Sequence, residues 1–99
     1  MSKFYFEINY NIYPEHRDSY INAVEELKSI VGDNPYGDFF VFENSKIANN
    51  FSEIYICNSE EEFEQLEDTQ NEQARDVINN IVENYVVDKK LNYFSKKEI

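Results

Sequence analysis

Three side chains of this chain are candidates for acid–base chemistry: Glu7, Glu53 and His16. The two glutamates lie in stretches typical of neighbouring β-strands and can share the open face of one sheet. Paired carboxylates inside a cavity raise each other's pKa and can act as acid and base. His16 would join them only by folding back over the sheet, with Glu7 orienting its second ring nitrogen. Outside a cavity, the same residues are surface glutamates and a histidine in a solvated first helical turn.

Four other residues offer hydrogen-bonding groups to a ligand: Tyr5, Asn9 and Asn11 in the first predicted strand, and Tyr55 in the third. A few converging polar groups in an apolar hollow are typical of small-molecule sites. In an enzyme, Asn9, Asn11 or Tyr55 would steady the anion of an aromatic or enolisable substrate. These four are the candidate ligand-binding residues, and whether the protein is an enzyme stays open.

The sequence does not support metal or cofactor chemistry. Glu61, Glu64 and Glu67 recur every third residue along one helix face, but no histidine or cysteine accompanies them, which predicts a solvated stripe. The chain has no phosphate-binding glycine loop and no nucleophile elbow. Cys57 has no cationic neighbour in sequence and is interpreted as a buried apolar filler. We expect no metal and no cofactor.

The elements that position these residues follow from hydrophobic periodicity. Strict alternation predicts strands over 3–13 and 51–58, with Tyr5, Glu7, Asn9 and Asn11 on one face of the first. The aromatic run at 39–42 predicts a strand over 36–43 that is buried on both faces. Which of its residues share the open face is undecided, because a slip of one residue exchanges the faces. The segment 90–98 predicts a lysine-tipped edge strand.

Two helices separate these strands. Pro14 ends the first strand and starts a helix whose apolar residues keep a 3–4 spacing out to Val31. Ser59 and Glu62 form a capping box that starts a second helix, which extends to about Val87. The stretch around Thr69 has no apolar residue, and the sequence leaves open whether the helix is continuous or broken there.

The order βαββαβ predicts one ferredoxin-like α+β domain over residues 1–99, with a four-stranded antiparallel sheet and both helices on one face. The other face would then expose more aromatic surface than a monomer usually shows. Eight tyrosines and eight phenylalanines are also many for so small a core. We therefore expect a homodimer through the sheet face, since closed two-fold dimers are the commonest assembly.

Nine basic and twenty acidic residues give a net charge of −11. Nucleic-acid phosphates and anionic membranes should repel such a chain. No apolar run is long enough to span a membrane, and no leader segment opens the chain, so we expect a cytoplasmic protein. The charge opposes dimerisation, so apolar contact must dominate, and salt should strengthen the dimer or leave it unchanged. Acidic groups would meet the C-terminal lysines, which are Lys89, Lys90, Lys96 and Lys97.

Two segments carry a resemblance to a known group of proteins. "IYPEHRDSYINAVEELKSI" (12–30) is similar to a strand–Pro–acidic–aromatic–helix opening, and "EIYICNSEEEFEQ" (53–65) to a strand–Ser–x–Glu–x–Phe helix entry. Both resemble the dimeric α+β barrel superfamily, in particular the small proteins similar to antibiotic-biosynthesis monooxygenases. The resemblance spans nearly the whole chain. It implies a dimeric barrel and a range of activities: cofactor-free oxygenation of aromatic polyketides, haem degradation, muconolactone isomerisation or none known.

The chain also departs from that superfamily. Many members have a histidine on the second helix where this chain has Leu66. Haem-degrading relatives combine a first-strand asparagine, a role open to Asn9 or Asn11, with a tryptophan and a helical histidine. This chain has no tryptophan and no histidine after His16. We therefore do not expect haem degradation.

Three functions remain. The first is a homodimer that binds a small aromatic or apolar molecule between helix and sheet or between two sheets. The second is a cofactor-free monooxygenase or isomerase with Glu7, Glu53 or His16 as its base. The third is a structural or regulatory interaction module, for which side chains would fill the interior.

Overall fold

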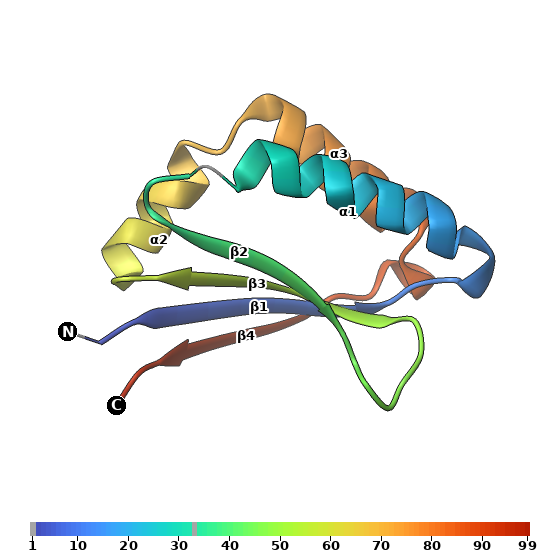
Figure 1. Ribbon diagram of the computed structural model, residues 1–99, viewed down its shortest axis with the longest axis horizontal. Coiled ribbons are helices and arrows are strands. Elements are labelled where there is room, and N and C mark those ends of the chain that lie inside the picture. Colours follow the sequence, from blue (N-terminus) through green and yellow to red (C-terminus); the bar gives the residue numbers. More distant parts are fainter. Residues whose placement is uncertain (1, 33) are drawn as a thin grey trace.

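The computed structural model describes residues 2–32 and 34–99. Four strands form one antiparallel sheet in the order β2-β3-β1-β4: β1 (Phe4–Asn11), β2 (Gly37–Glu43), β3 (Asn50–Cys57) and β4 (Asn92–Lys97). Three helices lie on one side of this sheet: α1 (Arg17–Val31), α2 (Glu60–Asp68) and α3 (Glu72–Asn84) (Figure 1). The predicted ferredoxin-like α+β fold is confirmed.

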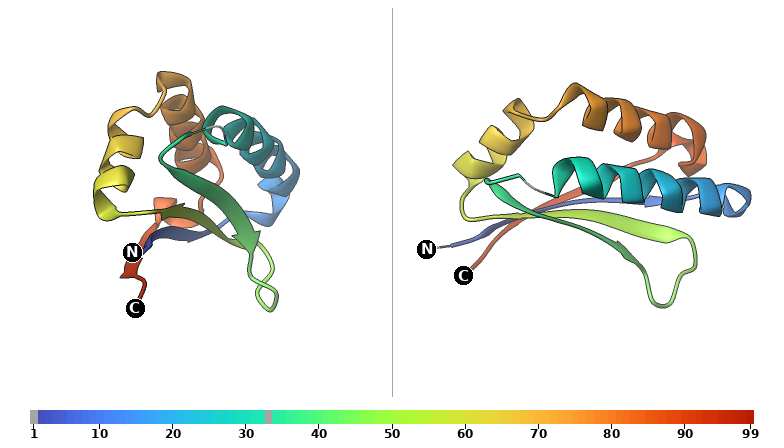
Figure 2. Two further views of the ribbon diagram at one scale, coloured as in Figure 1. Left: turned by 60° about the vertical axis from the view of Figure 1, so that its left-hand side comes forward. Right: turned by 45° about the horizontal axis from the view of Figure 1, so that its top comes forward.

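The second predicted helix is broken into α2 and α3, which run in different directions (Figure 2). Ser59 Oγ accepts a hydrogen bond from the backbone N–H of Glu62 at 3.1 Å, so the predicted N-cap starts α2. The helix ends at Thr69, and Asn71 caps α3 by accepting from the backbone N–H of Gln73 at 2.6 Å. The C-cap at Thr69 and the N-cap at Asn71, with no apolar residue between them, explain the break.

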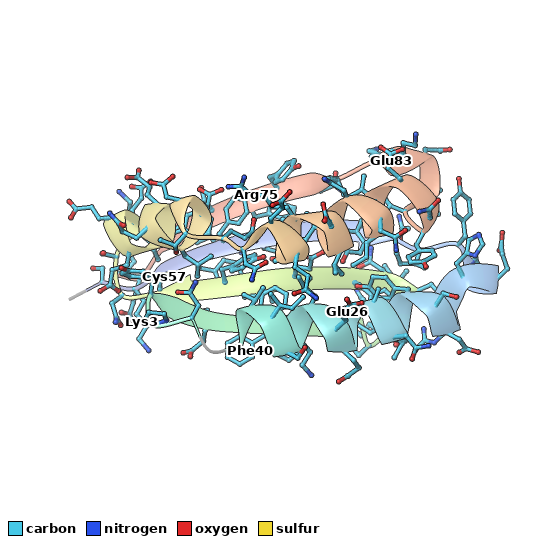
Figure 3. All side chains as sticks on the ribbon, turned by 90° about the horizontal axis from the view of Figure 1, so that it is seen from above. Lys3, Glu26, Phe40, Cys57, Arg75 and Glu83 are labelled. Atoms are coloured by element: carbon cyan, nitrogen blue, oxygen red, sulfur yellow. The ribbon has the colours of Figure 1, made fainter. Side chains whose placement is uncertain are left out.

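Helices α1 and α3 run side by side above the strands when the molecule is viewed from the helix side (Figure 3). The buried side chains of α1 follow the predicted stripe and are Tyr20, Ala23, Val24, Leu27 and Val31. Those of α3 are Ala74, Val77 and Ile81. This packing shields only the helix side of the sheet, and the opposite face has no cover within the described chain (Figure 1).

The strand register decides which side chains lie on each face. Ile8 pairs with Glu53 across β1 and β3, and Glu7 pairs with Ile54. Directly opposite residues share a face, so Glu53 lies under the helices while Glu7 lies on the open face.

In β2 the aromatic residues divide between the two faces. Phe39 packs against Tyr55 under the helices, whereas Phe40 and Phe42 are 39% and 57% exposed. The predicted burial of this strand on both faces is therefore wrong within one chain, because nothing in the chain covers the second face.

Candidate functional site

The open face carries a hydrogen-bonded carboxylate at Glu7. The Tyr5 hydroxyl donates to Glu7 Oε1 at 2.6 Å, and Ser52 Oγ donates to Glu7 Oε2 at 2.6 Å. Burial and the neighbouring Glu7 carboxylate raise the pKa of Tyr5 to about 12, so its phenol keeps its proton. Both oxygens of Glu7 are thus engaged, which does not favour Glu7 as a free base.

An amide ladder continues along the same face. Asn9 Nδ2 donates to Asn50 Oδ1 at 2.9 Å and to Ser52 Oγ at 3.0 Å. Asn50 Nδ2 in turn donates to Asn11 Oδ1 at 3.0 Å. Three of the four candidate ligand residues, Tyr5, Asn9 and Asn11, therefore lie together, but their polar groups are mostly satisfied by neighbouring strands.

Glu53 does not join this ladder. The prediction that Glu53 shares the open face with Glu7 is wrong, because the register turns it toward the helices, where it is 2% exposed. The Tyr10 hydroxyl donates a short hydrogen bond to Glu53 Oε2. Since that proton is directed to Glu53, the Tyr20 hydroxyl supplies the proton of the 2.9 Å contact between the two phenols.

The Glu53 carboxyl is only half satisfied in this core. Its Oε1 atom is buried and has no hydrogen-bond partner among the described residues. Burial raises the pKa of Glu53 to about 7, and the hydrogen bond from Tyr10 offsets part of that rise. Burial, together with the nearby Glu53 charge, also raises the pKa of Tyr10 well above its usual value. A core carboxyl that titrates near neutral pH can hold or release a proton under physiological conditions.

A pocket of about 240 Å³ opens between the sheet and helices α2 and α3. We term it the aromatic pocket. Its apolar lining comes from the sheet, from α2 and from α3, and consists of Phe6, Ile8, Tyr55, Phe63, Leu66, Ile78 and Tyr93. Glu67 of α2 and Gln70, in the link between α2 and α3, complete the lining. Phe63 and Leu66 are buried, whereas Tyr93 is 60% exposed and stands where the pocket opens to solvent.

Tyr55 is the candidate ligand residue that this pocket contains. It is 4% exposed, packs between Phe39 and Phe63, and its hydroxyl has no partner within residues 2–32 and 34–99. Burial, Glu53 and Glu67 together raise the pKa of Tyr55, so the phenol stays neutral. The expectation that Tyr55 lies with Tyr5, Asn9 and Asn11 is wrong, because β3 turns Tyr55 to the helix side.

His16 lies at the junction between a 3₁₀ turn (Pro14–His16) and α1. Its ring is 5.6 Å from that of Tyr85 and 6.3 Å from that of Tyr13, measured between centroids. Because Glu7 accepts from Tyr5 and Ser52 instead, His16 is not paired with that carboxylate. The placement matches the interpretation of His16 as a helix-start residue.

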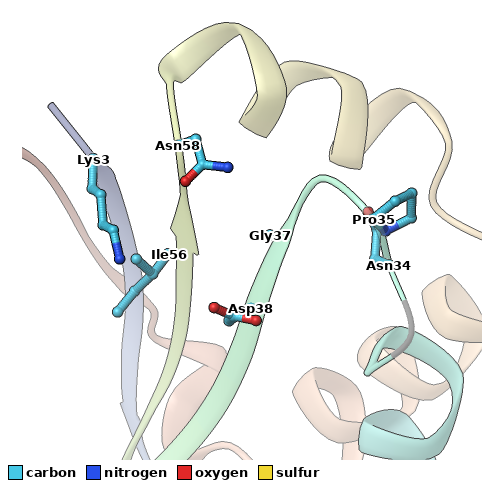
Figure 4. A pocket seen from close by; sticks show the side chains of 7 residues that line it. All are labelled: Lys3, Asn34, Pro35, Gly37, Asp38, Ile56 and Asn58. Carbon is cyan, nitrogen blue, oxygen red and sulfur yellow. The ribbon is translucent and has the colours of Figure 1, made fainter. Parts of the chain in front are cut away.

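A second, polar hollow of about 140 Å³ lies where β2 and β3 begin and end (Figure 4). Its lining includes Lys3, Asp38 and Asn58. Gly37 beside it is required for packing, because a Cβ there would lie 2.5 Å from Cys57 Sγ. Cys57 itself is 1% exposed, as the sequence predicts, and burial raises the pKa of its thiol. None of the described residues that line this hollow has a buried side-chain polar atom without a hydrogen-bond partner.

Metal ligands do not gather in the part of the chain that the structure covers, where no three His, Cys, Asp or Glu residues come within reach of one ion. None of the helices there is both long and apolar enough to cross a membrane.

Sequence reasoning missed most of the aromatic pocket. From the sequence, Phe6 and Phe63 are interpreted as core residues and Tyr93 as part of an edge strand. No local sequence pattern shows that the sheet, α2 and α3 leave a space between them. One signal was present. Leu66, at the position where the similar superfamily often has histidine, lies in the pocket wall.

Comparison with known proteins identifies the fold. No family model matches the sequence, and neither does any curated protein. A conserved protein from Methanosarcina mazei has a TM-score of 0.84 and 12% identity, over 100% of this chain and 95% of its own. An antibiotic biosynthesis monooxygenase has a TM-score of 0.72 and 13% identity, over 97% and 96%. SnoaB, a cofactor-independent oxygenase from Streptomyces nogalater, has a TM-score of 0.73 and 5% identity, over 95% and 90%. The predicted resemblance to antibiotic-biosynthesis-monooxygenase-like proteins is confirmed at the level of the fold.

Proposed function

We propose that this protein is a homodimer that binds a small, largely apolar aromatic molecule in the aromatic pocket. The observation that carries the proposal is Tyr55, a residue that is 4% exposed, lines a pocket rich in aromatic rings, and has a hydroxyl with no hydrogen-bond partner among the described residues. Buried polar groups normally have a partner, and one that lacks a partner in a pocket wall is available to a ligand. Ring faces at Phe6 and Phe63 offer the stacking or edge contacts that aromatic molecules prefer.

The dimer half of the proposal rests on the open sheet face. Phe42 is 57% exposed and Phe94 is 45% exposed, on strands at the two edges of that face. Ile54 lies between them on β3, opposite Phe40 and Glu7. A second copy stacked on this face would bury roughly 1,200–2,000 Å² in total, the usual size of a stable interface. The polar ladder from Tyr5 to Asn11 would then lie inside the interface with its hydrogen bonds already made.

A ligand screen by thermal unfolding tests the binding half. Neutral two-ring compounds such as 2-naphthol and 1,4-naphthoquinone should raise the Tm of the wild-type protein. A compound present at about one hundred times its Kd adds about 2.7 kcal/mol of stability, which is about 10 °C or more for a domain of this size. Ile78 is half-buried in the pocket wall, so the larger side chain of Ile78→Trp should fill the pocket and abolish the shift.

The matched control is Ile21→Trp, an equal change at a 36% exposed position on α1 outside the pocket lining. It should respond to the compounds as the wild type does. The binding proposal is wrong if no compound stabilises the wild type, or if Ile78→Trp responds as strongly as Ile21→Trp.

A cofactor-free oxygenase or isomerase is the second candidate, and one observation favours it. Of the three candidate bases, Glu53 is two residues from Tyr55 on the same face of β3, its Oε1 has no partner among the described residues, and burial raises its pKa to about 7. In this reading Glu53 takes the proton of an enolisable substrate and Tyr55 steadies the anion. The interaction module is favoured least, because side chains leave the aromatic pocket open.

A further inference from the structure

The charged group in the lining of the aromatic pocket is negative. Among the residues that the structure describes, Glu67 is the only charged one in the lining, which contains no lysine, arginine or histidine. Glu67 is exposed at the pocket rim and makes no ion pair within the described chain. The second available group is the hydroxyl of Tyr55, a residue that is 4% exposed and whose phenol stays neutral.

Two carboxylates act on the Tyr55 side chain. Glu67 of α2 lines the pocket, whereas Glu53 of β3 lies outside the lining, and both raise the pKa of the Tyr55 phenol. The rings of Phe6 and Tyr93, with centroids 6.1 Å apart, add the negative faces of their π-systems. An anionic ligand would meet repulsion from every one of these groups, while a cation on an aromatic body would meet attraction from each.

We infer that the aromatic pocket selects small aromatic molecules that carry a positively charged amine over neutral or anionic molecules of the same shape. The inference rests on the proposed binding function and adds the charge class of its ligand. The aromatic body lies on Phe6 and Phe63, the ammonium group donates to the Tyr55 oxygen, and the Glu67 carboxylate balances its charge. An ion pair at a rim and a cation beside ring faces together give about tenfold in affinity.

Three isosteric probes test this inference: 1-naphthylmethylamine, 1-naphthylmethanol and 1-naphthoic acid. Their affinities are measured by titration calorimetry at pH 7 against the wild type, Glu67→Gln and Glu64→Gln. The amine should bind the wild type about tenfold more tightly than the alcohol, and the acid should bind more weakly than both. In Glu67→Gln the amine and the alcohol should differ by no more than about twofold.

Glu64→Gln is the control, because Glu64 is an exposed carboxylate of the same helix outside the pocket lining. It changes the net charge equally, so it should keep the preference for the amine. If the alcohol binds as tightly as the amine to the wild type, or Glu64→Gln loses the preference as Glu67→Gln does, the inference is overturned while the binding function stands. If no probe binds the wild type, the proposed function fails with it.

Discussion

Replacing Glu53 by glutamine should remove a pH-dependent loss of stability of about 3 kcal/mol. Glu53 is buried with one oxygen unpaired among the described residues, and its pKa rises from 4.5 to about 7 on folding. Between these values the native state binds more protons than the unfolded state, so stability falls as pH rises from about 4.5 to about 7 and then levels off for this group. Glutamine is neutral throughout and can still accept from Tyr10.

Urea unfolding at pH 5 and pH 8, at one fixed protein concentration, measures this effect. The free energy of unfolding of the wild type minus that of Glu53→Gln should be about 2.5 kcal/mol lower at pH 8 than at pH 5. Tyr10, Tyr20 and Tyr55 all have raised pKa values and stay protonated in both conditions. The exposed Glu64→Gln variant should follow the wild type. Parallel curves for wild type and Glu53→Gln would show that the core carboxyl does not titrate in this range.

Charging the open sheet face should convert the protein from dimer to monomer. The double variant Phe40→Asp and Phe42→Asp places two carboxylates on the β2 side of the proposed interface, on a chain whose net charge is already −11. Loss of two buried aromatic contacts and burial of unpaired charge should weaken dimerisation by more than ~10³-fold. Sedimentation velocity at micromolar concentration should show a dimer for the wild type and a monomer for the variant.

The control for this experiment is Ile21→Asp, which places one carboxylate on the exposed surface of α1, on the helix side of the molecule. It should remain dimeric, and raising the salt concentration should strengthen the wild-type dimer or leave it unchanged, because screening reduces repulsion between the acidic chains. A wild type that sediments at the mass of one chain in both low and high salt would contradict the dimer proposal.

The faces of β1 could be predicted because its alternation is strict. Phe4 and Tyr10 are buried under the helices, while Tyr5 and Glu7 lie on the open face, as the pattern indicates. The strand β3 also alternates, yet its two faces are both partly apolar, and the pattern alone places Glu53 outside. The structure buries it because Tyr10, 43 positions away, supplies a hydrogen bond that no local pattern reveals.

The same limit applies to the candidate site. The predicted ligand residues Tyr5, Asn9 and Asn11 are neighbours on one strand face, and periodicity is enough to group them. The aromatic pocket instead collects Phe6, Tyr93 and residues of α2 that are far apart in sequence. Its existence depends on the break near Thr69, which sets the path of α2 over β3 and lets α3 turn away from it. The sequence left that break open, and so the pocket could not be predicted from it.

Backbone amide shifts in ¹H–¹⁵N correlation spectra, recorded while 2-naphthol is added to the wild-type protein, test the central claim most directly. Binding in the aromatic pocket should shift the amides of its lining, among them Phe6, Tyr55, Leu66 and Ile78, with one saturable Kd. The amides of Asn9, Asn50 and Phe94, which lie on the open face, should move little. Shifts that cluster on the open face instead, or no saturable shift at all, would contradict the assignment of the aromatic pocket as the binding site.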